Sequence, residues 1–396
     1  MASIKEKVNA LAQQFFQETV QMRRHLHQHP ELSFEEYHTS AYVKSVLNDM
    51  GISYQEMADT GIVAYIKGDL TSDEVIALRA DMDALPIQEV AGRSYGSQNA
   101  GVMHACGHDV HTSSLLGVAK ILHALKAEYG GVVKLIFQPG EERLPGGASI
   151  MIKEGVLQNP APSAIIGQHV MPFIEAGKVG FRAGKYMASC DELFMTVKGK
   201  GGHGAHPHQN IDPIVITAHI ITALQQITSR FADPRIPTVL SFGKISANGA
   251  TNVIPDEVYL EGTFRTFDEE WRAEAHEKMI KMATGMAESM GATCDFDVRK
   301  GYPFLINNPE LTMAARGFAE EYLGKEHVLD LELWPAAEDF SYYSQEIDAC
   351  FYRLGTGNKS KGIQSAVHTA TFDVDEDALL VSIGLMAYMT LRRLGY

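Results

Sequence analysis

The sequence predicts an α/β catalytic domain with an inserted ferredoxin-like α+β domain. Three short apolar runs are rich in β-branched residues: 75–80, 132–137 and 164–166. Continuous apolar runs of this kind are typical of strands buried on both faces of a largely parallel sheet. From about residue 187 the pattern changes to the order β-α-β-β-α-β, which is typical of the ferredoxin-like fold. Because the first pattern resumes after Gly301, we expect residues 1–186 and 301–396 to form the catalytic domain around the inserted residues 187–300.

Composition agrees with a globular protein of about two domains. The chain has 396 residues, of which 45% are hydrophobic and 21% are charged. It has no run of 18 apolar residues, so we expect no membrane span. The formal net charge is −15, and the sequence lacks the basic face that phosphate binding requires. We therefore expect no nucleic-acid partner.

The start of the chain and the cysteines predict a cytoplasmic protein. Residues 1–7 carry mixed charge and lead into an amphipathic pattern without the apolar segment of a secretory signal. The four cysteines, at 106, 190, 294 and 350, include no C-x-x-C pair, so neither a disulfide framework nor a structural zinc finger is indicated. A free thiol that binds metal fits a reducing compartment.

Polar side chains follow the three predicted strands of the catalytic domain. In chain order they are Asp81 and Asp83, then Glu141 and Glu142, then His169. Between the first two strands, residues 112–129 have apolar residues at helical spacing and are closed by glycines at 130–131, which predicts a helix. Ligands of open α/β sheets bind beyond the carboxyl ends of the strands, so these side chains are candidates for the active site.

The inserted segment divides into six elements. We expect strands at 190–198, 238–246, 257–267 and 293–299, and helices at 212–231 and 268–290. The glycine-rich segments 180–184 and 199–204 suit a hinge and a tight turn, respectively.

The densest group of metal-binding side chains lies between Met103 and His111. This run holds a thiol, three imidazoles and a carboxylate within nine residues. Cys106 and His108 are two residues apart, so in an extended chain both side chains leave the same face and can reach one ion or two adjacent ions. The alternative is a buried free cysteine beside surface histidines, which the spacing alone does not exclude.

Two adjacent acids follow the second strand. On a regular strand Glu141 and Glu142 would point to opposite faces, so both can enter one site only if the backbone turns irregularly. Pro139-Gly140 permits such a turn. We expect Glu142 to bind metal and Glu141 to act as a general base, and a solvated acidic turn is the alternative.

Two isolated histidines complete a set of possible ligands. His169 follows an apolar strand, and His368 lies before the last predicted helix. Each alone is more simply a hydrogen-bonded histidine of the core or of a loop. Together with Cys106, His108 and Glu142 they make five ligands, too many for one tetrahedral zinc, which favours two metal ions sharing a water. Such a pair lowers the pKa of the water and polarises a carbonyl, so amide hydrolysis becomes feasible near neutral pH.

Seven motifs occur in order along nearly the whole chain, at residues 24–36, 79–86, 104–111, 138–142, 199–208, 252–255 and 337–340. With these motifs the chain resembles the zinc-dependent amidohydrolases of the aminoacylase and carboxypeptidase superfamily, specifically the hippurate hydrolase and auxin-conjugate hydrolase branch. Their common order argues against a chance match. The resemblance implies a zinc-exopeptidase-like catalytic domain, an inserted domain that acts as a lid and in dimerisation, and hence a homodimer.

The resemblance also implies a set of metal ligands. These are Cys106, His108, Glu142, His169 and His368, with the Cys106 thiolate bridging the two ions or close to both. The ions would be Zn²⁺ or Mn²⁺, because a cysteine ligand favours zinc whereas histidine and glutamate tolerate either.

Catalytic groups follow from the same resemblance. Glu141 matches the general base, and Asp83 matches the acid that supports a metal-ligand histidine. Asp81 stands at the position where other branches carry a histidine ligand. In this branch His108 is the ligand instead, so we do not expect Asp81 to bind metal. Val110 departs from the glycine usual in the family but removes no ligand.

Three residues of the inserted domain match substrate-binding positions. His203 matches a histidine that stabilises the oxyanion, commonly in the active site of the partner subunit. Asn252 and Arg265 match groups that bind the oxyanion or the carboxylate of the substrate, for which an arginine fork is well suited. Arg265 has an alternative role as the ion-pair partner of an acidic neighbour.

These residues predict a binuclear metallohydrolase that acts on a small molecule. It would cleave the amide bond of an N-acyl amino acid and release a carboxylic acid and a free amino acid. A metal-dependent dipeptidase or carboxypeptidase needs the same metals and base and is the alternative enzyme. A catalytically silent metal-binding scaffold is the alternative outside catalysis, and Glu141 argues against it because binding alone needs no such acid.

Overall fold

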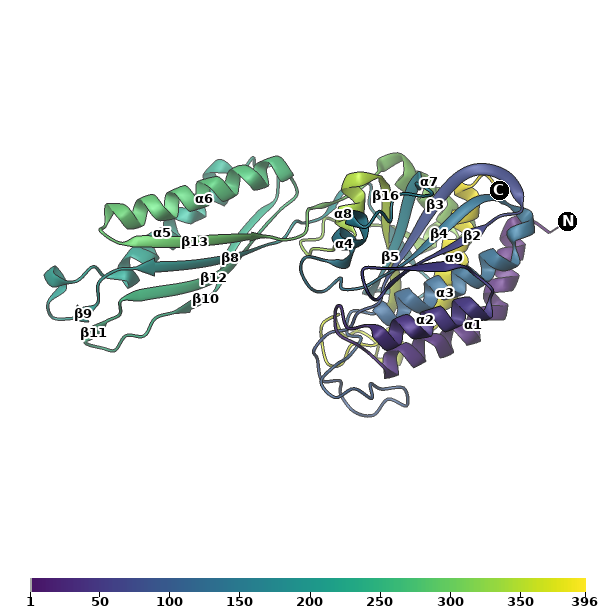
Figure 1. The fold of residues 1–396 in the computed structure, drawn as a ribbon, viewed down its shortest axis with the longest axis horizontal. Helices are drawn as coiled ribbons and strands as arrows, with labels where there is room; N and C mark the ends of the chain where they lie inside the picture. Colours follow the sequence, from purple (N-terminus) through teal and green to yellow (C-terminus); the bar gives the residue numbers. More distant parts are fainter. Residues whose placement is uncertain (1) are drawn as a thin grey trace. The chain divides into compact units, whose positions relative to one another are not determined.

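The computed structural model describes residues 2–396 (Figure 1). They divide into two compact units. The first unit comprises the residues up to Gly184 with Ile306–Glu332 and Asp339–Tyr396, and the second comprises Lys185–Leu305 and Leu333–Glu338. The second unit thus contains the predicted insertion 187–300 and a few more residues at each end.

One short segment lies in a different unit from the one that the sequence indicates. Residues 333–338 follow the insertion and read as part of the catalytic domain, but they group with the second unit. The Ala188 amide donates to the carbonyl oxygens of Trp334 and Ala336 at 3.1 and 3.2 Å. Main-chain pairing of this kind has no signature in the apolar pattern, which is why the sequence does not reveal it.

An eight-stranded sheet forms the core of the first unit, in the order β1-β2-β4-β3-β5-β16-β6-β15. Its strands are β1 (Tyr54–Met57), β2 (Gly61–Lys67), β3 (Leu70–Asp81), β4 (Gly130–Gln138), β5 (Ala164–Glu175), β6 (Val179–Phe181), β15 (Val328–Asp330) and β16 (Asp348–Gly357). The central strands β4, β3, β5 and β16 run parallel, as the apolar runs predict. Successive residues along them are buried, so both faces of the sheet are covered.

The first unit also contains these helices: α1 (Ile4–Gln28), α2 (Tyr37–Asp49), α3 (His108–Ala124), α4 (Gly147–Lys153), α7 (Pro309–Leu323), α8 (Ser341–Glu346) and α9 (Ala378–Arg393). Helices α1, α3 and α9 pack against one another, and α3 also contacts β3, β4 and β5 (Figure 1). Leu78 of β3, Val110 of α3 and Ile383 of α9 are buried in one hydrophobic core. Within residues 2–396, no helix combines the length and the apolar character that a membrane span requires.

Helix α3 begins at His108, four residues before the predicted start at Thr112. Its N-cap is Gly107, with a φ of +84° that glycine adopts at little cost. A Cβ at position 107 would lie 2.6 Å from Cγ2 of Val170, so a larger residue does not fit. Cys106 and His108 are therefore not on one face of an extended chain, as the sequence suggested, but on either side of a sharp turn into the helix.

Two further element ends differ from the prediction. Helix α3 ends at Ala124 and is followed by a 3₁₀ turn at Lys126–Glu128, so residues 130–131 begin β4 rather than close the helix. Strand β5 continues to Glu175, so His169 lies within the strand rather than after it. Pairing with β16 extends β5 beyond its apolar run.

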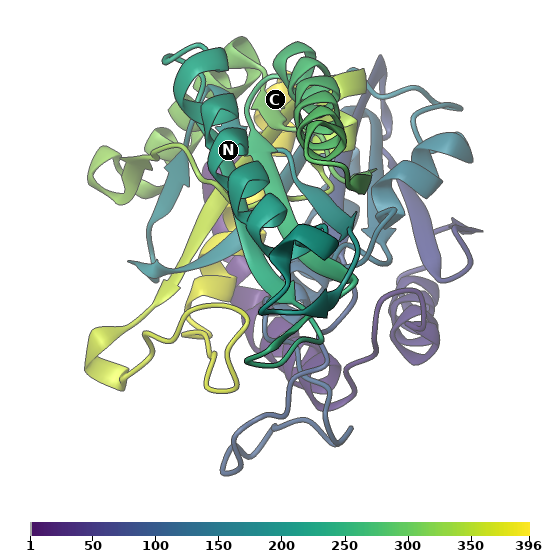
Figure 2. The same ribbon diagram turned by 90° about the vertical axis from the view of Figure 1, so that its left-hand side faces the viewer.

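The second unit has the predicted β-α-β-β-α-β order. Its elements are β8 (Asp191–Lys198), α5 (Pro213–Gln226), β10 (Thr238–Ser246), β12 (Glu257–Thr266), α6 (Glu269–Ser289) and β13 (Thr293–Lys300). The strands form an antiparallel sheet in the order β10-β12-β8-β13, as in a ferredoxin-like fold. Helices α5 and α6 lie side by side on one face of this sheet (Figure 2).

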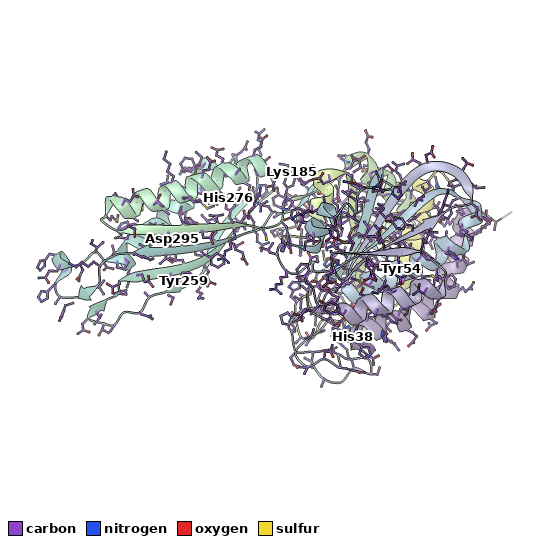
Figure 3. The ribbon with its side chains drawn as sticks, viewed as in Figure 1. His38, Tyr54, Lys185, Tyr259, His276 and Asp295 are labelled. Atoms are coloured by element: carbon purple, nitrogen blue, oxygen red, sulfur yellow. The ribbon has the colours of Figure 1, made fainter. Side chains whose placement is uncertain are left out.

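The other face of this sheet carries polar side chains. Tyr259 of β12 and Asp295 of β13, both labelled in Figure 3, are in register with Thr196 of β8. The three side chains therefore form one row across that face. Arg265 shares this face, because it stands an even number of positions from Tyr259 along β12.

A two-stranded sheet forms one end of the second unit. It consists of β9 (Gly202–His203) and β11 (Val253–Ile254) (Figure 1). Lys185 marks the opposite end of this unit (Figure 3). The chain passes between the units at the short strands β7 (Gly184–Met187) and β14 (Leu305–Asn307).

Candidate metal centre

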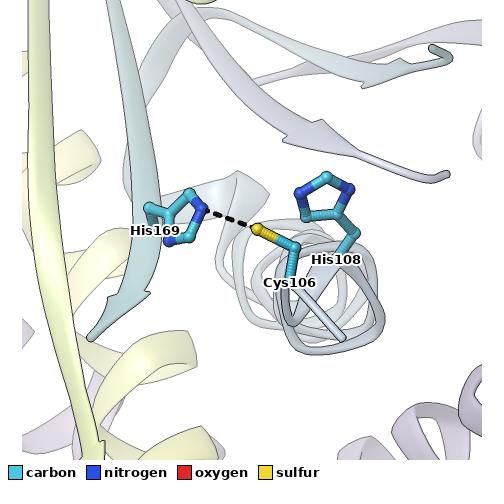
Figure 4. A group of neighbouring side chains, drawn as sticks. All are labelled: Cys106, His108 and His169. Atoms are coloured by element: carbon cyan, nitrogen blue, oxygen red, sulfur yellow. Dashed lines mark hydrogen bonds between the residues drawn. The ribbon is translucent and has the colours of Figure 1, made fainter. Parts of the chain in front are cut away.

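The five predicted metal ligands come together in the first unit. Cys106 belongs to two groups of three residues whose ligand atoms all lie within 4.8 Å of one another. One group is Cys106, His108 and His169 (Figure 4). The other is Cys106, Glu142 and His368. Because the two groups share the thiol, the five side chains can hold two cations next to each other.

The spacing of the ligand atoms matches that around a small cation. Cys106 Sγ lies 3.4 Å from His169 Nε2 and 3.3 Å from His368 Nε2. His368 Nε2 lies 3.2 Å from Glu142 Oε1. Zinc bonds of about 2.3 Å to sulfur and about 2.0 Å to nitrogen in a tetrahedral site separate neighbouring ligands by roughly 3.5 Å. The side chains are therefore already spaced for metal binding.

Hydrogen bonds orient two of the ligand imidazoles. His108 Nδ1 donates to Asp83 Oδ1 at 3.1 Å, and His169 Nδ1 donates to the carbonyl oxygen of Val170 at 2.7 Å. Each ring thereby presents Nε2 to the centre. His108 Nε2 is buried and has no hydrogen-bond partner within residues 2–396. Such an atom raises the free energy of the folded state unless something binds it, so the donor set fits divalent cations.

Negative charge accumulates at this centre. Burial raises the pKa of the Cys106 thiol well above its usual range, and the Glu142 carboxylate raises it further. Burial opposes protonation of His108, but the charges of Asp81 and Asp83 outweigh it and raise the His108 pKa to about 10. Both shifts favour the protonated forms of Cys106 and His108, and cation binding would displace these protons.

Glu141 lies beside the ligands but outside the two groups that share Cys106. Its side chain is 7% exposed, and its carboxylate lies within 4.8 Å of the ligand atoms of His108 and Glu142. The Asp339 amide donates to Glu141 Oε1 at 3.3 Å. A carboxylate held next to a metal centre in this way has the position that a general base requires.

The turn that carries Glu141 depends on Gly140. Its φ is +58°, and a Cβ there would lie 2.3 Å from the ring of Phe34. The Gly140 amide donates to Glu36 Oε1 at 2.8 Å, and the Phe34 amide donates to the same oxygen at 2.9 Å. These hydrogen bonds to Glu36 stabilise the irregular turn, which allows both Glu141 and Glu142 to point into one site.

Asp83 links two of the ligands. It accepts hydrogen bonds from His108 Nδ1 at 3.1 Å, from Ser33 Oγ at 2.6 Å and from the Glu142 amide at 3.0 Å. One buried carboxylate therefore orients a ligand imidazole and holds the backbone of a second ligand.

Asp81 has other partners. Its Oδ1 lies 2.5 Å from His111 Nδ1, and its Oδ2 accepts a hydrogen bond from Arg79 Nη1 at 2.7 Å. The same Oδ2 lies 3.5 Å from His108 Nε2. These contacts use both oxygens of Asp81 for hydrogen bonds within the protein.

Two of the predicted substrate-binding residues lie at one end of the second unit. His203 of β9 is in register with Val253 of β11, and the Gly204 amide donates to the Asn252 carbonyl at 2.9 Å. His203 and Asn252 are therefore neighbours. His203 Nδ1 accepts a hydrogen bond from the Ala205 amide at 3.1 Å, so the neutral ring carries its proton on Nε2 and can donate it.

Arg265 lies near the other end of β12. It is eight residues from Glu257, with which β12 begins, and about 3.3 Å per residue gives roughly 26 Å along the strand. Its Nη1 donates to the Pro335 carbonyl at 3.0 Å. Within residues 2–396 no carboxylate forms an ion pair with Arg265. The structure therefore does not support the alternative role of Arg265 as an ion-pair partner.

Comparison with known proteins places this centre in a family. Residues 77–392 match the profile of Peptidase family M20/M25/M40. The chain belongs to this family. The N-acyl-L-amino acid amidohydrolase of Geobacillus stearothermophilus is 43% identical over 307 residues, which cover 77% of this chain and 82% of that protein. Thermostable carboxypeptidase 2 of Saccharolobus solfataricus is 38% identical over 376 residues, which cover 94% of each chain.

Solved structures agree with this assignment. The crystal structure of the YXEP protein of Bacillus subtilis, described as a dinuclear metal binding peptidase from the M20 family, matches with a TM-score of 0.83 at 36% identity. The match covers 97% of this chain and 99% of that one. The predicted resemblance, the α/β fold and the assignment to hydrolases are therefore confirmed.

Sequence reasoning gave no role to several residues around the centre: Ser33, Glu36, Arg79, His111 and Asp339. Each lies inside one of the motifs that mark the family, so their positions were visible in the sequence. Their partners are distant along the chain, and only the folded structure brings them together.

Glu36 makes stability depend on pH. Burial and the charge of Asp83 raise the pKa of Glu36 from 4.5 to about 7. Because the folded state favours the protonated form, this contribution to stability is complete below pH 4.5 and is lost as the pH rises through about 7. The shift corresponds to about 3 kcal/mol. We expect the free energy of unfolding of the wild type, measured by urea titration, to fall by about that amount between about pH 5 and pH 8 relative to Glu36→Gln.

The exposed neighbour Glu35 provides the control for this experiment. Glu35→Gln should leave the pH profile of the wild type unchanged. Parallel profiles for the wild type and Glu36→Gln would mean that Glu36 stays ionised when buried.

Proposed function

We propose that this chain hydrolyses the amide bond of N-acyl amino acids and releases a carboxylic acid and a free amino acid. The observation that carries the proposal is the buried carboxylate of Glu141 beside two ligand groups that share the Cys106 thiol. A centre that only binds metal has no need of this acid. The relative named N-acyl-L-amino acid amidohydrolase supports the substrate class.

The ligands would hold two divalent cations: Cys106, His108, Glu142, His169 and His368. Such a pair, when bound, lowers the pKa of water and stabilises the negative charge that develops on a carbonyl oxygen. Asp83 keeps the proton of His108 on Nδ1, and the Val170 carbonyl keeps that of His169 on Nδ1.

Glu141 moves the proton in this reaction. Its carboxylate takes a proton from the attacking water and later gives it to the leaving nitrogen, which departs as the free amine. The Asp339 amide holds one carboxylate oxygen, and burial keeps bulk water from competing for the proton. One group thus acts first as base and then as acid.

The metal and the compartment follow from the Cys106 ligand. A thiolate favours zinc, whereas the imidazoles and the carboxylate also accept manganese, so we propose Zn²⁺ or Mn²⁺. The structure has all four cysteines free. Cys106 must stay reduced to bind a cation, so the proposal includes a cytoplasmic location.

A homodimer is part of the proposal. His203 and Asn252 lie at the end of the second unit where β12 begins (Figure 1). Arg265 lies roughly 26 Å along β12 from its first residue Glu257, so one small substrate is too short to contact both ends of the same second unit. Two chains paired through this unit would supply Arg265 from one copy and His203 with Asn252 from the other. Arg265 would bind the carboxylate of the substrate, and His203 Nε2 would donate to the oxyanion.

The surface of the second unit supports such pairing. Strand β10 is at the edge of its sheet, with Val239 40% and Ile245 61% exposed. An edge strand with exposed apolar side chains is a site at which a second chain can add.

Mixing two inactive variants tests the exchange of residues between subunits. His203→Ala and Glu141→Gln should each be inactive alone. If His203 acts in the partner's site, mixed dimers contain one complete site, and random mixing should restore about a quarter of wild-type activity. Activity that stays at the level of the separate variants, in a mixture shown to exchange subunits, would mean that His203 acts within its own chain.

A panel of substrates tests the reaction itself. The zinc- or manganese-loaded protein is offered N-acetyl, N-benzoyl and longer N-acyl amino acids alongside dipeptides, and free amino acid is measured. The proposal expects release from the acylated compounds that depends on Glu141. The relative named thermostable carboxypeptidase 2 favours the alternative of a peptidase, which release from peptides alone would establish. No release by fully loaded protein would leave the metal-binding scaffold as the better account.

A further inference from the structure

Arg79 is a buried cation that no step of the proposed reaction uses. It lies on β3 and is 1% exposed. Its guanidinium donates three hydrogen bonds to three side chains: Nε to Gln138 Oε1 at 2.9 Å, Nη1 to Asp81 Oδ2 at 2.7 Å and Nη2 to Asp339 Oδ1 at 2.6 Å. Asp81 is the last residue of β3, Gln138 is the last residue of β4, and Asp339 lies shortly before α8. Arg79 therefore joins three segments of the protein, and two series of hydrogen bonds lead from it.

The first chain leads to a metal ligand. Asp81 Oδ1 lies 2.5 Å from His111 Nδ1, and His111 Nε2 accepts a hydrogen bond from the Val170 amide at 3.0 Å. His111 therefore carries its proton on Nδ1 and donates it to Asp81. The carbonyl of the same Val170 accepts the hydrogen bond from His169 Nδ1 at 2.7 Å. A continuous series of hydrogen bonds thus runs from Arg79 through Asp81 and His111 to the backbone of Val170. The Val170 carbonyl then orients the imidazole of His169.

The second chain leads to the general base. The Asp339 carboxylate accepts hydrogen bonds from Arg79, from Gln138 Nε2 at 2.7 Å and from the Ala148 amide at 3.0 Å. A side chain held by three donors has little freedom, and its own backbone is fixed with it. The Asp339 amide is the group that donates to Glu141 Oε1.

The geometry requires an arginine. Three acceptors lie around one planar fork, whereas a lysine would present a single nitrogen to all of them. A buried ion pair is weak evidence of a contribution to stability, because desolvation offsets much of the attraction. The guanidinium fixes the positions of its acceptors relative to one another. Two of them, Asp81 and Asp339, connect to the ligand His169 and to the general base Glu141.

We propose that Arg79 is a positioning residue that sets both the orientation of the ligand His169 and the place of the base Glu141. The proposal rests on the proposed function for the role of Glu141, but its metal-binding part is independent of the substrate. Removing the fork would loosen the ion site that contains His169 and displace Glu141, and it would leave the group of Cys106, Glu142 and His368 intact.

Cobalt(II) titration of the Arg79→Lys variant tests the metal-binding part. Visible absorption reports the binding of each cobalt ion and its geometry without any substrate. We expect one of the two binding steps to weaken by about 10- to 100-fold, as is usual when support for a ligand is lost, and the other to keep its wild-type affinity. Two unchanged steps with the wild-type spectrum, or two steps weakened equally, would overturn the proposal.

The kinetic part is measured on whichever substrate the wild type cleaves. At saturating metal, kcat of Arg79→Lys should fall by about 10- to 100-fold with KM little changed, because the base is displaced and substrate contacts are not. An unchanged kcat would overturn this part. If the wild type cleaves no substrate, the proposed function fails while the cobalt titration still decides the metal-binding part.

Arg272 offers a matched control. It is also fully buried, and it forms ion pairs with Asp191 and Glu269 in the second unit. Arg272→Lys should leave both cobalt affinities as in the wild type, and loss of cobalt binding in this variant would attribute the effect to general destabilisation and overturn the proposal.

Should Arg79→Lys fail to fold, two milder variants separate the chains. Asp81→Asn is expected to weaken one cobalt site, and Asp339→Asn is expected to lower kcat with both cobalt sites intact. Wild-type cobalt binding in the first variant, or wild-type kcat in the second, would overturn the corresponding half of the proposal.

Discussion

Glu141→Gln is expected to lower kcat for amide hydrolysis by about 100- to 10,000-fold while the protein still binds two cations. Glutamine keeps the shape of the side chain and can accept the hydrogen bond from the Asp339 amide, but it cannot take a proton from water. The two ligand groups that share Cys106 do not include Glu141, so metal content should not change. Steady-state kinetics and the metal content of the dialysed protein measure the two effects separately.

Glu310→Gln is the control, because Glu310 is exposed in the first turn of α7. It should behave as the wild type in both measurements. Wild-type kcat in Glu141→Gln would remove Glu141 from the reaction, and loss of both cations from this variant would assign it to the metal centre instead.

The second large effect is expected at Cys106. Because its thiol is common to both ligand groups, Cys106→Ala should weaken both cation sites, each by more than about 100-fold, which is the upper end of the effect of losing a supporting residue. His169→Ala and His368→Ala each remove a ligand from one group only. We therefore expect close to no bound metal in the first variant and about one ion per chain in each of the other two, as measured by elemental analysis after dialysis.

Cys350→Ala is the matched control, since Cys350 on β16 is another buried thiol of the first unit and belongs to neither ligand group. It should retain both ions. Two ions per chain in Cys106→Ala would contradict a shared thiol, and a graded loss in which His169→Ala or His368→Ala loses both ions would show that the two sites do not bind independently.

Much of the fold could be predicted because its strands are either fully buried or regularly alternating. The apolar runs place β4 within two residues at each end and lie inside the longer strands β3 and β5, and the six elements of the second unit follow from their periodicity. The start of α3 differs from the prediction because it depends on the positive φ of Gly107, a conformation with no apolar signature.

Residue type and spacing identified the five side chains that the structure brings together around Cys106, but not how they are held. A thiol, imidazoles and carboxylates are informative because few other structures need them together. The supporting groups are ordinary residues whose meaning lies in their partners. Arg79 and Asp339, for example, are separated by 260 positions, and no local pattern relates them. A resemblance to a family marks such positions without giving their contacts.

The most direct test compares two substrates that differ in one group. For the metal-loaded wild type, kcat/KM is measured for the N-acyl amino acid that it cleaves fastest and for the matching peptide, in which the acyl chain carries an additional α-amino group. We predict a kcat/KM at least about tenfold higher for the N-acyl amino acid, and a dependence on Glu141 for both. A higher kcat/KM for the peptide would contradict the account and identify the enzyme as a peptidase.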